Sequence, residues 1–348
     1  MNEPAILGLA TTEGPFPAAQ ADVRAQTLSM FEGADFDAIE LSSVFENAAI
    51  ARRTFAWPLE RFAERPGVAE RAARFSELAP VMLADAARRA ADESLRGRIT
   101  HVVTVCSSGI ATPTLECLLA GDLGIPASAR RVPVFGLGCA GGAAGLAIAR
   151  DLASSSEDAC VLLLVIELTS LTLITDDASR RNFVACALFG DGAAAAVIGE
   201  PTGDHPALAT IGKCVTKLIP NTLELMGWDV EANGWRVVFS PRIPAVVKRE
   251  VGALVAEAMD GERPTHFVLH PGGAKVLDAY RHSLELVDGD LAVSAAVLRD
   301  HGNMSAATVL FVLDRVLREK GRPAGKGVMT AFGPGFSAEA ICLSFPAG

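Results

Sequence analysis

The sequence has few aromatic residues and no surplus of positive charge. Aromatic residues make up 6% of the 348 residues, with a single tyrosine, whereas 50% of the chain is hydrophobic. The core must therefore be built mainly from alanine, valine, leucine and isoleucine. The formal net charge is −10, which argues against nucleic acid as a general partner because a phosphate backbone attracts a basic surface. A local arginine cluster can still bind a small anion.

The sequence also lacks the patterns of secretion, membrane insertion and metal binding. No basic segment followed by a long apolar one opens the chain, so we expect no signal peptide. The longest strongly apolar run, residues 160–166, is far shorter than the ~20 residues that cross a bilayer. The seven cysteines form no CxxC pair and their number is odd, which favours buried free thiols in a reducing cytoplasm over disulfides or zinc.

Buried strands alternate with helices in the first part of the chain. Fully apolar strands are typical of a parallel-rich sheet that is covered on both faces. Apolar spacing predicts helices at 76–98 and 143–153, and the arginine-rich stretch 46–75 is expected to form a solvent-exposed helical face. The predicted strands are 5–10, 99–105, 132–135, 161–166 and 192–198.

The same order of elements recurs in the second part of the chain. Residues 200–235 are rich in turn residues and are the predicted break between two halves, residues 1–203 and 204–348. Each half repeats a buried strand, a tight turn carrying a polar residue, and a helix. The sequence therefore predicts an α/β protein with an internal duplication. In the second half the predicted helices are 246–259 and 305–318, and the strands are 265–269, 327–332 and 340–345.

Cys139 lies in a glycine-rich turn, GLGCAGGAAG, between a predicted strand and a predicted helix. Gly136, Gly138, Gly141 and Gly142 permit a sharp turn and the close approach of a ligand. A thiol at a helix N-terminus feels the positive end of the helix dipole, which favours the thiolate. Alone, the pattern fits a small core cysteine equally well, which is how the other six cysteines are interpreted.

Two further turns carry a polar residue that can serve a cysteine nucleophile. His270 ends an apolar strand in HFVLHPGGAK, and Asn303 precedes a helix in RDHGNMSAATV. A core histidine and a helix N-cap are the structural alternatives. Together with Cys139, however, the set suits acyl transfer. The thiolate takes an acyl group from a thioester, and His270 and Asn303 donate to the carbonyl of a second, malonyl thioester, whose loss of CO₂ leaves an enolate. No metal or redox cofactor is needed.

Five segments in order resemble the type III polyketide synthase, or chalcone synthase-like, family. The resemblance covers nearly the whole chain and implies a thiolase-like fold with αβαβα layers, a homodimer, and acyl-CoA starters that are extended with malonyl-CoA. It implies a pyrone, resorcinol or phloroglucinol-type product and the catalytic set Cys139, His270 and Asn303. The segments are GCAGG, LFGDGAA, HPGGAKVLD, HGNMSAATVLFVLD and AFGPGFSAE.

The resemblance also implies residues around the substrate. Phe189 matches a gatekeeper between the CoA tunnel and the cavity, and Val237 falls where a second phenylalanine is common, which indicates a more open cavity and an aliphatic starter. Arg52 and Arg53 lie in the region that binds CoA phosphates. The remaining cavity positions are Thr112, Thr169, Thr172 and Trp228.

Two other functions remain open from the sequence. A ketoacyl-carrier-protein synthase III-like enzyme shares the three polar residues and performs one condensation, but usually carries HQAN where this chain has HPGG at His270. A degenerate, non-catalytic member of the fold would be expected to have lost one of the three residues, and none is lost.

Overall fold

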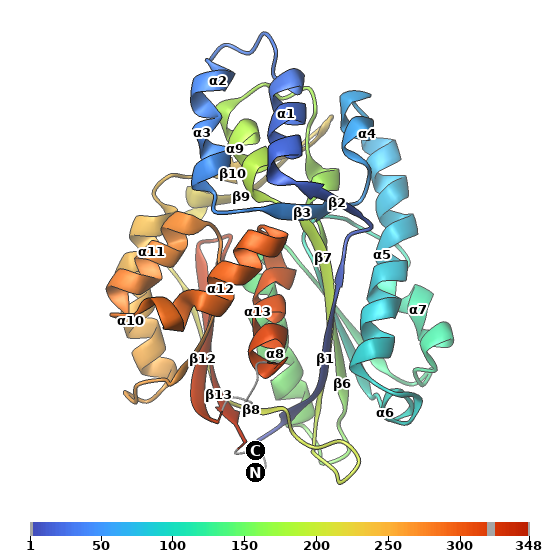
Figure 1. Ribbon diagram of the computed structural model, residues 1–348. Helices are drawn as coiled ribbons and strands as arrows, with labels where there is room; N and C mark the ends of the chain where they lie inside the picture. The colour runs from blue at the N-terminus through green and yellow to red at the C-terminus, as the bar shows by residue number, and fades with distance from the viewer. Residues whose placement is uncertain (1–2, 319–323, 347–348) are drawn as a thin grey trace.

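The computed structural model describes residues 3–318 and 324–346, and nine of their strands form one large sheet. Figure 1 shows the sheet running through the middle of the molecule, with helices on both of its faces and between its two parts. The nine strands, in their order across the sheet, are β11 (His266–Leu269), β12 (Gly325–Gly333), β13 (Ser337–Phe345), β8 (Ala209–Leu218), β1 (Ala5–Glu13), β7 (Asp191–Gly199), β6 (Val161–Leu168), β4 (His101–Cys106) and β5 (Arg130–Phe135).

The two parts of this sheet repeat one topology. In the first part, β5, β4 and β6 are parallel, and β7 and β1 follow as antiparallel neighbours. In the second part, β11 and β12 are parallel, and β13 and β8 follow as antiparallel neighbours. Only two residue pairs between β1 and β8 join the parts, Ala5 with Thr210 and Ile6 with Ala209. The division into domains 1–203 and 204–348 stays a prediction, and its boundary lies in the loop between β7 and β8.

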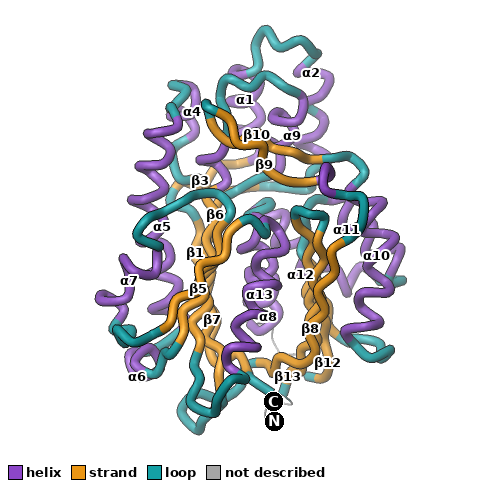
Figure 2. Tube along the Cα trace, turned by 180° about the vertical axis from the view of Figure 1, so that it is seen from behind, coloured by secondary structure: helices purple, strands orange, loops and turns teal. Residues whose placement is uncertain are grey.

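Two helices fill the space between the parts, α8 (Gly141–Ala153) and α13 (Thr308–Arg318). Figure 2 shows both helices between β7 and β6 on one side and β8 and β12 on the other. All of the residues 308–313 are buried, as expected for a helix packed on several sides. The central core is therefore a helix layer between two sheet layers, in agreement with the predicted αβαβα order.

The outer faces of the sheet are covered by amphipathic helices. On the first part, α5 (Val68–Ala90) packs against β1, β6 and β7, and α7 (Leu115–Leu123) packs against α5. On the second part, α10 (Ile243–Ala258) packs against β8 and β13 and against α11 (Ala274–Ser283), while α12 (Asp288–His301) contacts β11 and α13. Strands β6 and β7 are buried along their whole length, which explains their continuous apolar sequences.

A cap of short elements covers one end of the sheet, at the top of Figure 1. A cluster of phenylalanine rings holds it together: Phe31, Phe36 and Phe45 each contact the ring of Phe183. The few aromatic residues of the chain are thus concentrated in this cap. Its elements are α1 (Gln20–Met30), α2 (Ala38–Leu41), α3 (Ser43–Asn47), α4 (Leu59–Ala63), α9 (Arg180–Leu188), β2 (Phe16–Ala19), β3 (Arg52–Phe55), β9 (Met226–Glu231) and β10 (Gly234–Phe239).

Two sequence predictions about the fold are wrong, and a third stretch contains a strand that the sequence analysis did not predict. The helix predicted at 76–98 is α5 followed by α6 (Glu93–Gly97), because Asp92 accepts a hydrogen bond from Leu95 N at 2.8 Å and starts a new helix. The turn-rich stretch 200–235 contains the ten-residue strand β8, whose alternating exposure hides it from an apolar pattern. The arginine-rich stretch contains strand β3, and Arg53 and Arg71 are buried rather than solvent-exposed.

The cysteines are free thiols, as predicted, but not all of them are buried. All seven cysteines are free, yet Cys117 is exposed and Cys186, Cys214 and Cys342 are half-buried. Among the described residues, no helix is both long and apolar enough to cross a membrane.

The N-terminal ends of α8 and α13 meet at a glycine. A Cβ atom at Gly142 would lie 2.2 Å from the backbone oxygen of Ala306 and 2.8 Å from Cγ1 of Val309. We expect Gly142→Ala to lower the free energy of unfolding by ~1–3 kcal/mol, because the obstacle is backbone and the overpacked helices must separate. Urea unfolding followed by circular dichroism measures this change.

The matched control is Gly121→Ala in α7, where nothing lies within 4 Å of the added methyl group. This substitution should be neutral or should stabilise the protein by ~0.4–1 kcal/mol. Equal stability changes in the two variants would contradict the close helix contact.

Candidate active site

Cys139 lies in the short 3₁₀ turn η1 (Gly138–Ala140), directly before α8. Gly136 and Gly138 have φ angles of 91° and 47°, which favour glycine and let the chain turn sharply from β5 into the helix. The amide of Gly138 donates to Ser107 Oγ at 2.9 Å, so the loop after β4 supports this turn. The thiol is 5% exposed.

Asn303 occupies the equivalent place in the second part, before the 3₁₀ turn η4 (Ser305–Ala307) and α13. Its Oδ1 accepts a hydrogen bond from the amide of Ser305 at 2.8 Å, so the capping role is real. Its Nδ2 donates to the Gly272 carbonyl at 3.2 Å and lies 3.9 Å from Cys139 Sγ. One amide hydrogen therefore holds the side chain in place, and the other faces the thiol.

His270 follows β11 and completes the cluster. Its backbone amide donates to the Thr330 carbonyl at 2.9 Å, which fixes it at the end of the sheet. The side chain is buried, and neither ring nitrogen has a hydrogen-bond partner among the described residues. His270, Cys139 and Asn303 line one small cavity with about 300 Å³ of empty space. The structure thus brings together the three residues that the sequence predicted to act together.

Burial keeps both titratable members of this cluster neutral. It raises the pKa of the Cys139 thiol to about 11 and lowers the pKa of His270 to about 4. At pH 7 the resting site therefore holds a thiol and a neutral imidazole. The His270 ring and Cys139 Sγ are not hydrogen-bonded to each other in this structure. A neutral imidazole is able to accept the thiol proton when a thioester is attacked.

Three residues beside the nucleophile were missed by the sequence analysis. Glu167 is fully buried, and burial raises its pKa to about 8. Tyr280, the only tyrosine, lines the cavity of Cys139 with a buried hydroxyl group that lacks a hydrogen-bond partner in the described structure. Phe239 lines the same cavity and contacts the Phe189 ring, with centroids 6.4 Å apart. A charge inside an apolar strand was the available signal for Glu167, but no sequence pattern marked Tyr280 or Phe239.

A larger chamber has Phe189 in its wall, and the Phe189 ring contacts Phe239 in the wall of the Cys139 cavity. The chamber encloses about 620 Å³ of empty space, partly open to solvent, and Phe189, Val237, Thr169, Thr172 and Trp228 all lie in its wall. The rings of Phe189 and Trp228 are 6.5 Å apart, so the predicted gatekeeper packs between Trp228 and Phe239. These five positions therefore do border one space, and their roles toward substrate stay predictions.

The hydroxyl protons of the two threonines are already used. Thr169 donates to the Gly190 carbonyl at 2.6 Å, and Thr172 donates to the Thr169 carbonyl at 2.7 Å. Both threonines therefore stabilise a buried turn of the chain. Their oxygens can still accept hydrogen bonds, but neither donor is available to a polyketone.

The remaining predicted site residues lie elsewhere. Arg52 is exposed and forms a bidentate ion pair with Glu13, and its contact to CoA stays a prediction. Arg53 is 1% exposed and lies in the chamber wall, a placement that argues against the predicted contact to CoA phosphates. Thr112 is exposed on the loop between β4 and α7, away from both cavities of this chain.

A solved type III polyketide synthase domain has this architecture. The C-terminal type III polyketide synthase domain of Steely1 from Dictyostelium superimposes with a TM-score of 0.92 and 26% identity, covering 99% of both chains. The layered fold with a cysteine, a histidine and an asparagine at the ends of its two repeated parts thus places the chain among thiolase-like acyltransferases.

Sequence comparison then gives the family. Residues 58–202 match the N-terminal domain of chalcone and stilbene synthases, and residues 210–345 match their C-terminal domain, so the chain belongs to this family. It is 32% identical to a putative chalcone synthase of Bacillus subtilis, covering 99% of both chains. It is 36% identical to 1,3,6,8-tetrahydroxynaphthalene synthase of Streptomyces peucetius, covering 97% of this chain and 92% of the relative.

The family defines the general activity. Its members are type III polyketide synthases, acyltransferases that condense CoA thioesters without a cofactor. The chain is therefore a type III polyketide synthase. The ketoacyl-carrier-protein synthase alternative and the non-catalytic alternative are not supported by these matches.

Removal of the imidazole tests the electrostatics of the cluster. Since burial raises the pKa of Cys139 to about 11, the thiol is protonated at pH 7, and we expect His270 to accept its proton as the sulfur attacks. We expect alkylation of Cys139 by iodoacetamide at pH 7 to fall ~10²-fold or more in His270→Ala. The residual rate should rise about tenfold per pH unit below the thiol pKa. Mass spectrometry of the Cys139 peptide across pH 6–10 measures both, and identical profiles in the two proteins would contradict this role.

Proposed function

We propose that Cys139 carries the growing chain and that His270 and Asn303 act on it as base and donor. The observation that carries the proposal is the Asn303 amide, which is fixed by Gly272 and Ser305 and faces Cys139 Sγ at 3.9 Å. A fixed donor in a cavity that excludes water stabilises developing negative charge more strongly than a mobile one.

Loading begins with proton transfer. Neutral His270 accepts the thiol proton, and the sulfur attacks the carbonyl carbon of an acyl-CoA starter. A bond forms from Cys139 Sγ to this carbon, the bond from the carbon to the CoA sulfur breaks, and the CoA sulfur leaves with the proton from His270. The helix dipole of α8 favours the transient negative charge on Sγ.

Extension uses the same two donors on a second thioester. When malonyl-CoA loses CO₂, the electron pair of the broken bond moves into an enolate, whose oxygen accepts hydrogen bonds from Asn303 Nδ2 and from the His270 ring. The enolate carbon then attacks the acyl thioester on Cys139 and displaces the sulfur. Repetition gives a polyketone, and cyclisation to a pyrone, resorcinol or phloroglucinol-type ring releases the product.

The chamber at Phe189 favours an aliphatic acyl group as the starter. Its wall is mainly apolar, and Val237 leaves more room than the phenylalanine that is common at this position. Apolar wall atoms favour a chain without aromatic bulk, because burial of each methylene group contributes about 0.8 kcal/mol. The pyrone, resorcinol and phloroglucinol-type products differ in the length of the polyketone and in how it bends before ring closure. The shape of the chamber controls both.

We further propose that the enzyme forms a homodimer and works in a reducing cytoplasm. Strand β5 is an edge of the large sheet, and Phe135 at its end is 57% exposed. Ile110, on the loop after the neighbouring strand β4, is 68% exposed. An exposed edge with large apolar side chains is a template for pairing with a second chain. The free cysteines fit a reducing compartment.

An assay with acyl-CoA starters tests the activity. Incubation with malonyl-CoA and straight-chain acyl-CoAs should release CO₂ and leave an acyl group on Cys139, followed by cyclic products detected by mass. Cys139→Ala should form no acyl-enzyme. If no starter in the panel labels Cys139 and no CO₂ appears, the proposed function is wrong.

Asn303→Ala separates the two half-reactions. Loss of one fixed donor should slow malonyl-CoA decarboxylation by ~10²–10³-fold, while acylation of Cys139 should change much less, since it uses His270 as base. Quenched-flow measurement gives, for decarboxylation and for acylation, the ratio of the rate in the unaltered protein to the rate in the variant. Equal losses in the two steps would contradict the assigned role.

Phe135→Asp tests the proposed dimer. A carboxylate on this edge should shift the protein toward the monomer in sedimentation velocity, because a buried charge without a partner opposes association. The control is Ile39→Asp on α2, a side chain that is 75% exposed and lies outside the proposed interface. A dimer unaffected by Phe135→Asp would place the interface elsewhere.

A further inference from the structure

Arg53 is a buried cation without a carboxylate partner. Its Nε donates to Gln20 Oε1 at 3.0 Å, and its Nη1 donates to the Phe189 carbonyl at 2.5 Å. Its Nη2 has no hydrogen-bond partner, and Arg53 takes part in none of the ion pairs found between the described residues. Burial lowers its pKa to about 10, so the guanidinium is still charged at pH 7.

Such a group is costly unless something else satisfies it. A charge taken out of water loses several kcal/mol of solvation. Hydrogen bonds to neutral oxygens, and the attraction of the buried Asp191 carboxylate, which forms no ion pair with Arg53, offset this loss only in part. The ring of Phe55 lies 5.4 Å from the guanidinium carbon and adds a weaker cation–π contact. The Nη2 group of Arg53 therefore remains without a hydrogen-bond acceptor.

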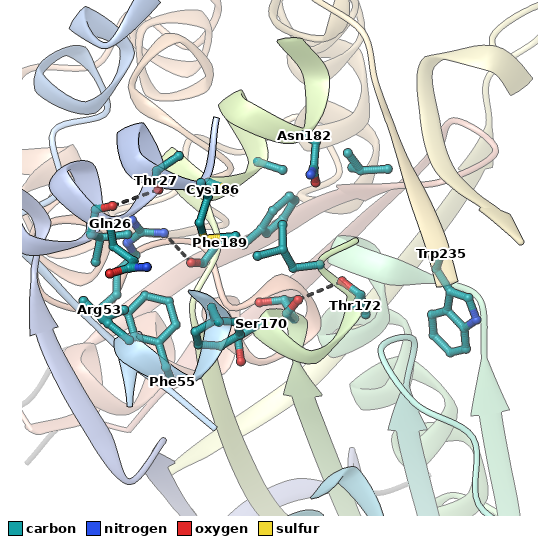
Figure 3. A pocket seen from close by; sticks show the side chains of 18 of the residues that line it. Gln26, Thr27, Arg53, Phe55, Ser170, Thr172, Asn182, Cys186, Phe189 and Trp235 are labelled. Atoms are coloured by element: carbon teal, nitrogen blue, oxygen red, sulfur yellow. Dashed lines mark hydrogen bonds between the residues drawn. The ribbon is translucent and has the colours of Figure 1, made fainter. Parts of the chain in front are cut away.

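Arg53 lies in the wall of the chamber at Phe189, and its unpartnered Nη2 is buried there. Figure 3 shows Arg53 beside Phe189 and Cys186 at one side of the chamber. Three other polar side chains of the wall have used their donors: Thr27 donates to the Val23 carbonyl, Ser170 to Asp191, and Asn182 to two backbone carbonyls. Gln26 and two tryptophans also line the chamber. The chamber is thus a mainly apolar space with a charged donor in its wall.

The same arginine links the chamber to the reacting groups. Through Nη1 it holds the carbonyl of Phe189, whose backbone pairs with Asn303. Phe189 also contacts Phe239, which lines the cavity of Cys139. An acyl chain attached to Cys139 that passes the Phe189 ring therefore enters the space where Arg53 lies.

We propose that this chamber binds the far end of the acyl chain through an oxygen acceptor, a keto or carboxylate oxygen, which pairs with Arg53 Nη2. This inference rests on the proposed function and narrows its substrate class from plain aliphatic to oxygen-bearing chains. A polyketone offers such an oxygen on every second carbon, and an ω-carboxyacyl starter offers one at its end. A plain alkyl chain leaves the buried N–H group without a partner.

The test uses straight acyl-CoAs of about four to ten carbons in three matched forms: plain, with a terminal methyl ketone, and with a terminal carboxylate. Single-turnover acylation of Cys139 is read by mass. At one favoured length, an oxygen-bearing form should acylate with a kcat/KM ~10- to 100-fold above the plain form, as expected for a hydrogen bond to a charged group. The ketone and carboxylate arms identify which oxygen is preferred.

Arg53→Met should abolish this preference, and Arg71→Met should preserve it. Arg71 is also buried and in the same stretch of sequence, but both of its terminal nitrogens have partners, the carbonyls of Pro66 and Asn233. If Arg53→Met fails to fold, Cys186→Phe narrows the chamber without removing a hydrogen bond of Arg53 and should likewise remove the preference.

The outcomes distinguish this inference from the proposed function. Absence of acylation with every CoA thioester overturns the proposed function. Acylation without any preference for oxygen-bearing chains, or a preference that survives both Arg53→Met and Cys186→Phe, overturns the role of Arg53 and leaves the function in place.

Discussion

The close contact between the N-terminal ends of α8 and α13 is the constraint on which the active site depends. No side chain fits between Gly142 and the Ala306 carbonyl, so the two helix starts approach more closely than residues with Cβ atoms allow. Cys139 precedes one helix and Asn303 precedes the other. The thiol and the amide therefore meet because the two repeated parts of the fold pack through these helices.

The site combines this rigid frame with polar atoms that the protein itself does not satisfy. Both ring nitrogens of His270, one oxygen of Glu167, the hydroxyl of Tyr280 and Nη2 of Arg53 are buried without hydrogen-bond partners in the described chain. Native interiors contain few such atoms, and each lowers stability. They border the cavity of Cys139 or the chamber at Phe189, or lie close to them, where the proposed mechanism has substrate supply the missing partners.

The two repeated parts have diverged in a way that suits their tasks. The first part has β5 as an additional outer strand, while in the second part the chain runs from β11 through α11 and α12 directly to Asn303. The large sheet therefore ends in β5 at the first part and in β11 at the second. The second part places two polar residues, His270 and Asn303, opposite the single nucleophile of the first.

The sequence alone determined the alternation of strands and helices and the three polar turns, because buried strands and glycine-rich turns are local patterns. It also placed Phe189 and Val237 beside one cavity through family resemblance. Tertiary structure decided what local patterns do not contain. Arg53 appeared to be a surface cation, but the cap buries it against Phe189, and Tyr280 gave no local signal at all. The sequence showed which side chains can do chemistry, whereas burial and missing partners, set by distant segments, decided the environment in which each one acts.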